Sequence, residues 1–296
     1  MKLRKLLIAN RGEIAIRIAR AAHELEIETV AVHTADDARS LHVRRADTAV
    51  LLDGRGAAGY LDIPQIVAIA AREKCDCVHP GYGFLSENAA FAAALAQSGI
   101  VFVGPTPQQL ELFGDKLKAK ALARSLDVPV ADGTTGPTSL DDAIKFFRTL
   151  KPGQAALVKA VAGGGGRGMR IVSQAEELEE AMARCRSEAL SAFGNGDVYL
   201  ERLMPRARHI EVQIVGDNAG AVTHLLEREC TLQRRHQKIV ELAPSPGLAP
   251  ALRDKLVAAA LRMAGKANYR SLGTFEFLVE ADAGPRGRIE CAKAAR

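Results

Sequence analysis

Residues 157–169 read Leu-Val-Lys-Ala-Val-Ala-Gly-Gly-Gly-Gly-Arg-Gly-Met, with five glycines in six positions between two short apolar runs that are typical of β-strands. Ordering a glycine costs more conformational entropy than ordering any other residue, so this cluster needs a physical reason. One reason is a backbone that must approach a polyphosphate closely and present its N–H groups, with Lys159 and Arg167 adding positive charge. The alternative is a hairpin tip that binds nothing.

The residues after the glycines distinguish this stretch from other phosphate-binding loops. A Walker A loop needs Gly-Lys-Ser/Thr at the start of a helix, and no such sequence follows. The dinucleotide-binding pattern also leads into a helix, whereas 169–172 has the apolar character of a strand. The sequence therefore predicts a glycine-rich hairpin that covers phosphates as a lid.

Length and composition indicate a globular protein of two domains, or of one large domain with an inserted lobe. Of the 296 residues, 48% are hydrophobic and 25% are charged, and the net charge is +5. This mild basic excess suits an anionic small ligand, while the absence of Trp and the 4% of aromatic residues argue against a nucleic-acid partner. No apolar run is long enough to span a membrane, and five scattered cysteines suggest reduced thiols in the cytoplasm.

The first third of the chain predicts a parallel α/β sheet. Strands at 5–9 and 28–33 flank an amphipathic helix at 13–25, which is a βαβ opening. The turn at 10–13 holds a single glycine, so this Rossmann-like domain need not bind a nucleotide. The same alternation continues with helices near 63–73 and 87–97 and strands at 76–79 and 100–103.

The sequence Gly-Pro-Thr-Pro at 104–107 is typical of a turn or loop, and it lies just before the expected domain boundary. We expect a first domain at 1–113 and a second at 114–296, with a separate lobe at about 131–204 that contains the glycine-rich stretch. Ser86 is the expected N-cap of the helix near 87–97. The later expected elements are a helix carrying Asp115 and Lys116, helices at 174–191 and 250–268, and strands at 197–201, 208–215, 220–227 and 273–280.

Three groups of polar side chains are candidates for chemistry. Lys159 lies on a strand with apolar neighbours, where an unpaired charge is costly, so it needs a phosphate or a structural carboxylate as partner.

Glu276 and Glu290 lie on strands that flank a turn, and antiparallel pairing would bring their carboxylates together, as in Mg²⁺ sites beside phosphates. The alternative for these two is a pair of solvent-facing acids on an edge hairpin. The basic segment Gln233–Lys238 is either a solvated patch or a surface for an anionic substrate.

Together these segments resemble biotin carboxylase, the ATP-grasp component of acetyl-CoA, propionyl-CoA and pyruvate carboxylases. The matching stretches follow the order of that family and span almost the whole chain: Ile8–Ala15, His79–Asn88, Gly114–Lys116, Lys159 with Gly163–Met169, Gln233–Lys238 and Gly273–Leu278. The resemblance implies an α/β fold, with a Rossmann-like N-terminal domain followed by an incomplete ATP-grasp domain that has an inserted lid lobe. It also implies that ATP activates bicarbonate to carboxyphosphate and that CO₂ then passes to biotin on a carrier protein.

The same resemblance implies roles for individual residues. The ATP phosphates would be held by Lys116, Lys159, Gly165 and Gly166. Adenine would be lined by Glu201, Arg202, Leu203 and Met204, and the nucleotide site would be completed by His209, Gln233 and His236. Lys238 would meet bicarbonate, and Mg²⁺ or Mn²⁺ would be held by Glu276 and Glu290. The implied partners are a biotin carboxyl carrier protein or domain and a carboxyltransferase, with a homodimer as one option.

The chain departs from the family pattern after Glu290. Family members continue with a metal-binding Asn and a catalytic Arg, where this sequence has Ala292 and Ala294. An alanine side chain neither coordinates a metal nor stabilises an anion, and the family's general-base Glu, biotin-contacting Arg and C-terminal domain do not follow. The sequence therefore predicts a truncated biotin carboxylase that binds Mg-ATP and is impaired in catalysis.

Two other functions stay open at this point. One is another ATP-grasp ligase, such as a carbamoyl-phosphate synthetase lobe, although the segment Gln233–Lys238 argues for the carboxylase. The other is a non-catalytic module that pairs with intact carboxylase subunits. The sequence does not set the final acceptor of the carboxyl group.

Overall fold

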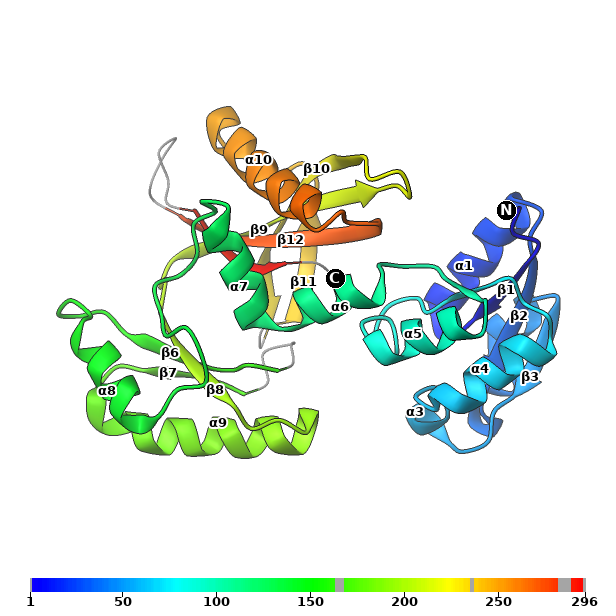
Figure 1. Ribbon diagram of the computed structural model, residues 1–296, viewed down its shortest axis with the longest axis horizontal. Coiled ribbons are helices and arrows are strands. Elements are labelled where there is room, and N and C mark those ends of the chain that lie inside the picture. The colour runs from blue at the N-terminus through cyan, green and yellow to red at the C-terminus, as the bar shows by residue number, and fades with distance from the viewer. Residues whose placement is uncertain (1, 163–167, 235–236, 282–288, 295–296) are drawn as a thin grey trace. The chain divides into compact units, whose positions relative to one another are not determined.

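The structure is a computed structural model that describes residues 2–162, 168–234, 237–281 and 289–294. The chain divides into two compact units, Met1–Glu111 and Leu112–Arg296 (Figure 1). Across the described ranges, no helix combines the length and the apolar character that crossing a lipid bilayer requires.

The first unit is a parallel sheet with the strand order β3-β2-β1-β4-β5. The central strand β1 pairs in parallel with β2 on one side and with β4 on the other, so the predicted βαβ opening and parallel sheet are confirmed. The strands are β1 Lys5–Ile8, β2 Glu28–His33, β3 Thr48–Leu51, β4 Cys77–His79 and β5 Val101–Phe102. The helices are α1 Gly12–Glu24, α2 Leu41–Arg45, α3 Gly56–Gly59, α4 Ile63–Arg72 and α5 Ala89–Gln97, with a 3₁₀ turn at Ala35–Asp37.

Both faces of this sheet are covered because its strands are apolar on both sides. Leu6 and Ile8 of β1 pack with Ile18 of α1, whereas Leu7 packs on the opposite face with Ile66 of α4. Helix α5 joins α4 on that second face through its buried residues Phe91, Ala92 and Leu95. Helices on the two faces of an open parallel sheet make this unit Rossmann-like.

The loops at the carboxyl ends of these strands are fixed by side-chain hydrogen bonds. The Asn10 side chain donates to the carbonyl oxygens of Pro80 and Tyr82, at 2.6 and 2.8 Å. The predicted cap Ser86 was wrong: α5 begins two residues later, where the Asn88 side chain accepts from the backbone N–H of Phe91. An Asn side chain caps a helix as well as a Ser does, and α5 starts at Ala89, directly after Asn88.

The second unit contains a five-stranded antiparallel sheet, β11-β10-β9-β12-β13, and a three-stranded antiparallel sheet, β7-β6-β8. The strands are β6 Ala156–Ala160, β7 Met169–Val172, β8 Val198–Arg202, β9 Ala207–Gly216, β10 Val222–Arg234, β11 Gln237–Leu242, β12 Ser271–Glu280 and β13 Ile289–Ala294. The helices are α6 Pro107–Gly114, α7 Lys116–Ser125, α8 Leu140–Arg148, α9 Leu178–Phe193 and α10 Pro250–Lys266, with a 3₁₀ turn at Ala175–Glu177.

Asp115 separates two helices where the sequence suggested one. Its carboxylate accepts hydrogen bonds from the backbone N–H groups of Leu117 and Lys118, which makes Asp115 the N-cap of α7. Helix α6 ends at Gly114. Strand β11 was also not predicted, because its residues were interpreted as a basic patch rather than as the partner of β10.

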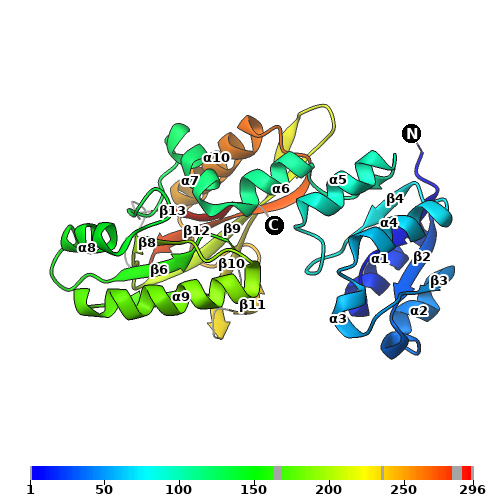
Figure 2. The same ribbon diagram turned by 60° about the horizontal axis from the view of Figure 1, so that its bottom comes forward.

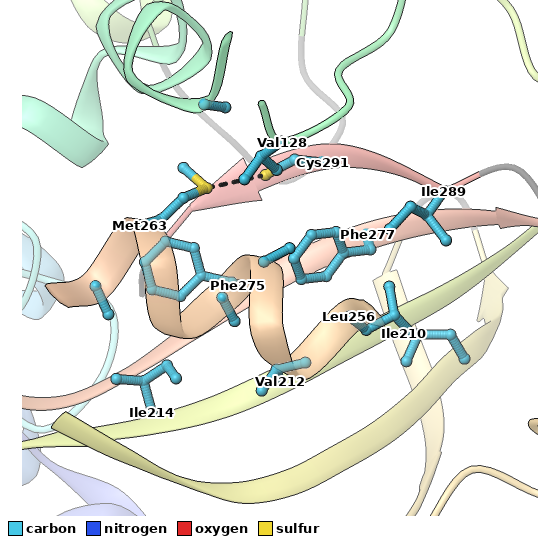
Figure 3. Close-up of a cluster of buried hydrophobic side chains, with 14 of the residues drawn as sticks. Val128, Ile210, Val212, Ile214, Leu256, Met263, Phe275, Phe277, Ile289 and Cys291 are labelled. Carbon is cyan, nitrogen blue, oxygen red and sulfur yellow. Dashed lines mark hydrogen bonds between the residues drawn. The ribbon is translucent and has the colours of Figure 1, made fainter. Parts of the chain in front are cut away.

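One face of the five-stranded sheet packs against α10 and α7 and forms the main core of this unit. Figure 3 shows Phe275 of β12 beside Met263 of α10, and Phe277 of β12 near Leu256 of α10 and Ile210 of β9. The thiol of Cys291 on β13 lies 3.9 Å from the sulfur of Met263, so β13 closes this core. The opposite face of the sheet is thereby left for polar side chains.

Helices α8 and α9 cover one face of the three-stranded sheet, as the turned view in Figure 2 shows for α9. Val158 of β6 and Leu200 of β8 pack there against Met182 and Leu178 of α9. Because strand residues alternate between faces, Lys159 and Glu201 point to the side away from these helices.

Candidate active site

The polar face of the five-stranded sheet carries two acidic residues directly opposite each other. Phe275 and Phe277 enter the core, so Glu276 between them faces the other side. Glu276 of β12 is the register partner of Glu211 of β9. Glu211 is buried, with 4% of its surface exposed, and Glu276 is half-buried.

Glu290 and His209 lie on the same face as Glu276. Leu278, two residues along β12, is opposite His209 of β9 on one side and opposite Glu290 of β13 on the other. The predicted antiparallel pairing of the two glutamate-bearing strands is therefore confirmed, with the glutamates offset by two positions along the ladder. Glu290 is only 1% exposed, which contradicts the alternative of a solvent-facing acid on an edge hairpin.

Lys238 of β11 joins the two opposed glutamates. Its ammonium donates to Glu211 at 2.5 Å and to Glu276 at 2.7 Å. Burial by itself lowers the pKa of Lys238, but the carboxylates of Glu276 and Glu211 outweigh it and raise the pKa above its usual value. Arg228 of β10 also forms an ion pair with Glu211, so each glutamate has a cationic partner.

His209 and Gln233 border this cluster. Burial is the largest influence on His209 and lowers its pKa, which favours the neutral imidazole at pH 7. Gln233 of β10 is the register partner of Lys238, and its side-chain N–H donates to the carbonyl oxygen of Cys230 at 2.9 Å. His236 lies outside the described residues.

Glu290 connects the two sheets of the second unit. Its carboxylate accepts a hydrogen bond of 2.7 Å from Arg202, the last residue of β8. Arg202 also pairs with Asp132 at 3.2 Å. Leu203 and Met204 follow directly, and the backbone N–H of Leu203 donates to the carbonyl oxygen of Ala155.

A second charged cluster lies on the three-stranded sheet. Of the two partners that the sequence left for Lys159, the structure contains the carboxylate: Lys159 Nζ lies 2.5 Å from Glu201 Oε2. The other carboxylate oxygen of Glu201 accepts from Lys120 of α7 at 2.7 Å. Burial of Glu201 raises its pKa, but the charges of Lys159 and Lys120 outweigh this and lower the pKa to about 2. Lys116 Nζ donates to the carbonyl oxygen of Ala160, next to Lys159.

Two carboxylates on one face of adjacent strands have the chemistry of a Mg²⁺ site. Glu276 and Glu290 supply oxygen ligands, which Mg²⁺ prefers, and few protein ligands are needed when phosphates complete the shell. The group Glu211, Cys230 and Glu241 also brings potential ligand atoms within 4.8 Å. Burial raises the pKa of the Cys230 thiol to about 12 and Glu211 is already paired with two cations, so that group is a poor metal site.

Family comparisons decide which kind of site this is. Residues 2–110 match the family model "Biotin carboxylase, N-terminal domain". Residues 115–291 match the model "Carbamoyl-phosphate synthase L chain, ATP binding domain". The chain belongs to the biotin carboxylase family. It is thus an α/β protein with a Rossmann-like first part and an ATP-grasp second part.

Curated relatives of this biotin carboxylase chain are pyruvate carboxylases. The Aspergillus niger enzyme is 51% identical over 284 residues, which are 95% of this chain and 24% of that protein. Human mitochondrial pyruvate carboxylase is 49% identical over 282 residues, 94% of this chain and 24% of that protein. The chain therefore spans about a quarter of the length of these relatives.

Solved biotin carboxylase structures share the fold closely. The biotin carboxylase domain dimer of Hydrogenobacter thermophilus 2-oxoglutarate carboxylase, in complex with MgADP, ADP and bicarbonate, matches with a TM-score of 0.94 at 39% identity. That match covers 99% of this chain and 64% of the solved one. The Campylobacter jejuni biotin carboxylase–β-γ-ATP complex matches with a TM-score of 0.94 at 38% identity, over 99% of this chain and 65% of the other.

Three charged residues of these two clusters were missed in the sequence. Glu211 alternates with His209 on β9, so period-two spacing from His209 was a usable signal. Arg228 lies one residue beyond the strand predicted at 220–227, whereas β10 continues to Arg234. Lys120 lies in an unremarkable Lys-Ala-Lys-Ala stretch, and nothing local separates it from its exposed neighbour Lys118. Gly165 and Gly166 of the predicted lid lie outside the described residues.

Proposed function

We propose that this chain binds Mg-ATP at a biotin carboxylase site, where ATP activates bicarbonate to carboxyphosphate and CO₂ passes to carrier-bound biotin, and that Ala292 and Ala294 leave this chain impaired in that catalysis. The observation that carries the proposal is the cluster in which Lys238 is held between Glu211 and Glu276 on the polar face of the ATP-grasp sheet. A fixed ammonium beside two carboxylates offers an anion contact and metal ligands within one small area. Phosphoryl transfer relies mainly on such positioning and charge neutralisation.

In this proposal Glu276 and Glu290 hold Mg²⁺, or Mn²⁺ in its place. The metal would neutralise charge on the ATP phosphates. Lys238 would bind bicarbonate, because Glu276 and Glu211 keep its ammonium protonated and fixed in position. Arg202 donates to the carboxylate of Glu290 at 2.7 Å and gives this buried acid a cationic partner.

The nucleotide would lie between the two charged clusters of the second unit. Lys116, Lys159, Gly165 and Gly166 would contact its phosphates. Adenine would be lined by Glu201, Arg202, Leu203 and Met204, and the site would be completed by His209, Gln233 and His236. Two findings support this arrangement: the ammonium of Lys116 reaches the backbone of Ala160, and Arg202 ties β8 to the metal-site glutamate Glu290.

The wider assembly is also part of the proposal. We take residues 1–113 as the first domain and 114–296 as the ATP-grasp domain, with the lid lobe at about 131–204. The partners would be a biotin carboxyl carrier protein or domain and a carboxyltransferase, and the chain would form a homodimer in a reducing compartment such as the cytoplasm.

The test is nucleotide binding followed by turnover with the purified chain. We expect fluorescent ATP to bind more tightly with Mg²⁺ than with EDTA. Because Ala292 and Ala294 replace the metal-binding Asn and the catalytic Arg of the family pattern, we expect only slow bicarbonate-dependent ADP formation and no rise with biotin. Lys238→Met should abolish the bicarbonate dependence, whereas Lys255→Met, an exposed residue of α10 on the covered side of the sheet, should not. A chain that does not bind ATP at all would overturn the proposal.

A second candidate is a carbamoyl-phosphate synthetase-like ligase, because the family model matched by 115–291 carries that description. Both reactions begin by activating bicarbonate, so the second substrate separates them. Bicarbonate-dependent ADP formation that rises with ammonia, and not with biotin, would favour this candidate. The match of 2–110 to the biotin carboxylase model supports the carboxylase instead.

A further inference from the structure

Lys120 is a buried lysine on the same helix as the proposed phosphate ligand Lys116. It is 5% exposed and lies on the face of α7 that also buries Ala119 and Ala123. Its ammonium donates to Glu201 at 2.7 Å and lies 3.4 Å from the carbonyl oxygen of Ala131. A lysine in this environment needs a specific electrostatic reason, because taking its charge out of water is costly.

Glu201 divides its carboxylate between two lysines. One oxygen accepts from Lys120 and the other from Lys159, so two cations surround one anion in a buried position. The Tyr199 ring lies 5.4 Å from the Lys120 ammonium and closes that side of the cluster. The three charges leave one net positive charge, which an anionic ligand can neutralise.

The geometry has a consequence for Lys159, which lies on the strand that leads into the glycine-rich stretch. If Lys159 turns to a phosphate, Glu201 loses one of its two partners. With Lys120 in place, Glu201 remains in a neutral ion pair. Without Lys120, the carboxylate would be left buried and unpaired, which is strongly unfavourable, so Lys159 would be held back from the ligand.

We propose that Lys120 is a positioning residue, which retains Glu201 so that Lys159 is free to bind the phosphates of a nucleoside triphosphate. The inference rests on the proposed ATP site and adds to it a residue that makes no ligand contact itself. It also explains why two lysines, 81 and 42 residues from Glu201 along the chain, converge on one carboxylate.

The test compares Mg-ATP binding by Lys120→Met in two backgrounds. With Glu201 present, we expect the substitution to weaken binding by about tenfold or more, because Glu201 then retains Lys159. In the Glu201→Gln background, the same substitution should change the Kd by less than about twofold, because no carboxylate remains to hold Lys159 back. A simple loss of positive charge near the phosphates would instead weaken binding by the same factor in both backgrounds.

Two further variants separate positioning from folding. Lys120→Arg keeps the ion pair and should bind Mg-ATP nearly as the unmodified chain does. Lys118→Met removes an exposed lysine of the same helix and should leave the Kd unchanged. Equal binding by Lys120→Met and the unmodified chain, or an equal factor in both backgrounds, overturns the inference. An unmodified chain that does not bind Mg-ATP overturns the proposed function, and this inference falls with it.

Discussion

Glu211 and Glu276 are direct cross-strand partners on β9 and β12, and the ammonium of Lys238 lies within 2.7 Å of both carboxylates. Like charges opposite each other in a sheet repel and destabilise it. Lys238, together with Arg228 on Glu211, turns that repulsion into a network of ion pairs. The sheet therefore holds two carboxylates side by side, each with a cationic partner, at the place where the proposed metal and bicarbonate would bind.

Lys238→Met should destabilise the second unit at neutral pH. Removing one partner of a buried ion pair costs about 3–5 kcal/mol, and for this half-buried lysine we expect about 1–3 kcal/mol. The loss should shrink as the salt concentration rises, because counter-ions screen the repulsion between Glu211 and Glu276. Hydrogen exchange of peptides from β9 and β12 measures it, with peptides from the first unit as an internal reference.

Lys255→Met is the matched control for that loss, since its side chain is exposed on α10. It should change the opening free energy of these strands by no more than about 0.5 kcal/mol. A loss in Lys238→Met that grows as the salt concentration rises would contradict the electrostatic explanation.

Glu290→Gln should weaken the Mg²⁺-dependent part of nucleotide binding. One of two proposed carboxylate ligands is then neutral, and we expect the Kd for Mg-ATP to rise by about tenfold, equivalent to ~1.4 kcal/mol. Binding of ATP in EDTA should change far less. Titration of a fluorescent ATP analogue, with and without Mg²⁺, measures both values.

Glu280→Gln provides the control, because Glu280 is an exposed glutamate at the end of β12. It should leave the Mg²⁺ dependence intact. An equal rise in Kd with and without Mg²⁺ in Glu290→Gln would show that Glu290 acts through Arg202 rather than through the metal.

The sequence predicted those parts of the fold in which neighbouring segments of the chain pack or pair with each other. The βαβ opening followed from apolar strands around an amphipathic helix, and the pairing of β12 with β13 followed from two strand-like segments around a short turn. The partner of Lys159 did not follow, because Glu201 is 42 residues away and the sequence pattern cannot distinguish a phosphate from a carboxylate. Lys120 was missed for the same reason: its partner Glu201 is 81 residues away, and only the fold buries the lysine beside that carboxylate.

Phe277→Ala should be among the most damaging single changes in the second unit. Phe277 is 1% exposed and lies between α10 and the strands β9 and β13 (Figure 3). Truncating a buried phenylalanine costs about 3–5 kcal/mol through lost burial and the cavity left behind. The expected result is faster exchange of the amides of α10 and β12, with those of the first unit unchanged.

Leu272→Ala is the comparison for this loss. Leu272 is on the same strand but 57% exposed, so its removal should cost less than about 0.5 kcal/mol. A comparable effect of the two substitutions would mean that the core seen around Phe277 does not limit the stability of this unit.

His42 should make the first unit sensitive to mild acid. The side chain is 2% exposed, so its imidazole is shielded from water. Burial lowers the pKa of His42 below its ordinary value of 6.5, and the backbone of Val32 and the carboxylate of Asp37 oppose this only in part, while the charges of His33 and Arg11 add to it. The folded state therefore takes up the proton less readily than the unfolded state.

The direction of the effect follows from linkage. A group whose pKa is lowered on folding contributes stability above its unfolded pKa, and this stability is lost as the pH falls from about 6.5 through the folded value. His42→Phe keeps a ring of similar shape and removes the titrating group, so it should flatten the loss of stability of the first unit below pH 6.5. Hydrogen exchange of β2 amides between pH 5 and pH 8, corrected for intrinsic exchange rates, measures this slope.

His23→Gln changes an exposed histidine of α1 and should leave the slope as it is. If the slope persists unchanged in His42→Phe, His42 does not cause the acid sensitivity. The next candidate is then His79, the other histidine of this unit whose pKa is lowered by burial.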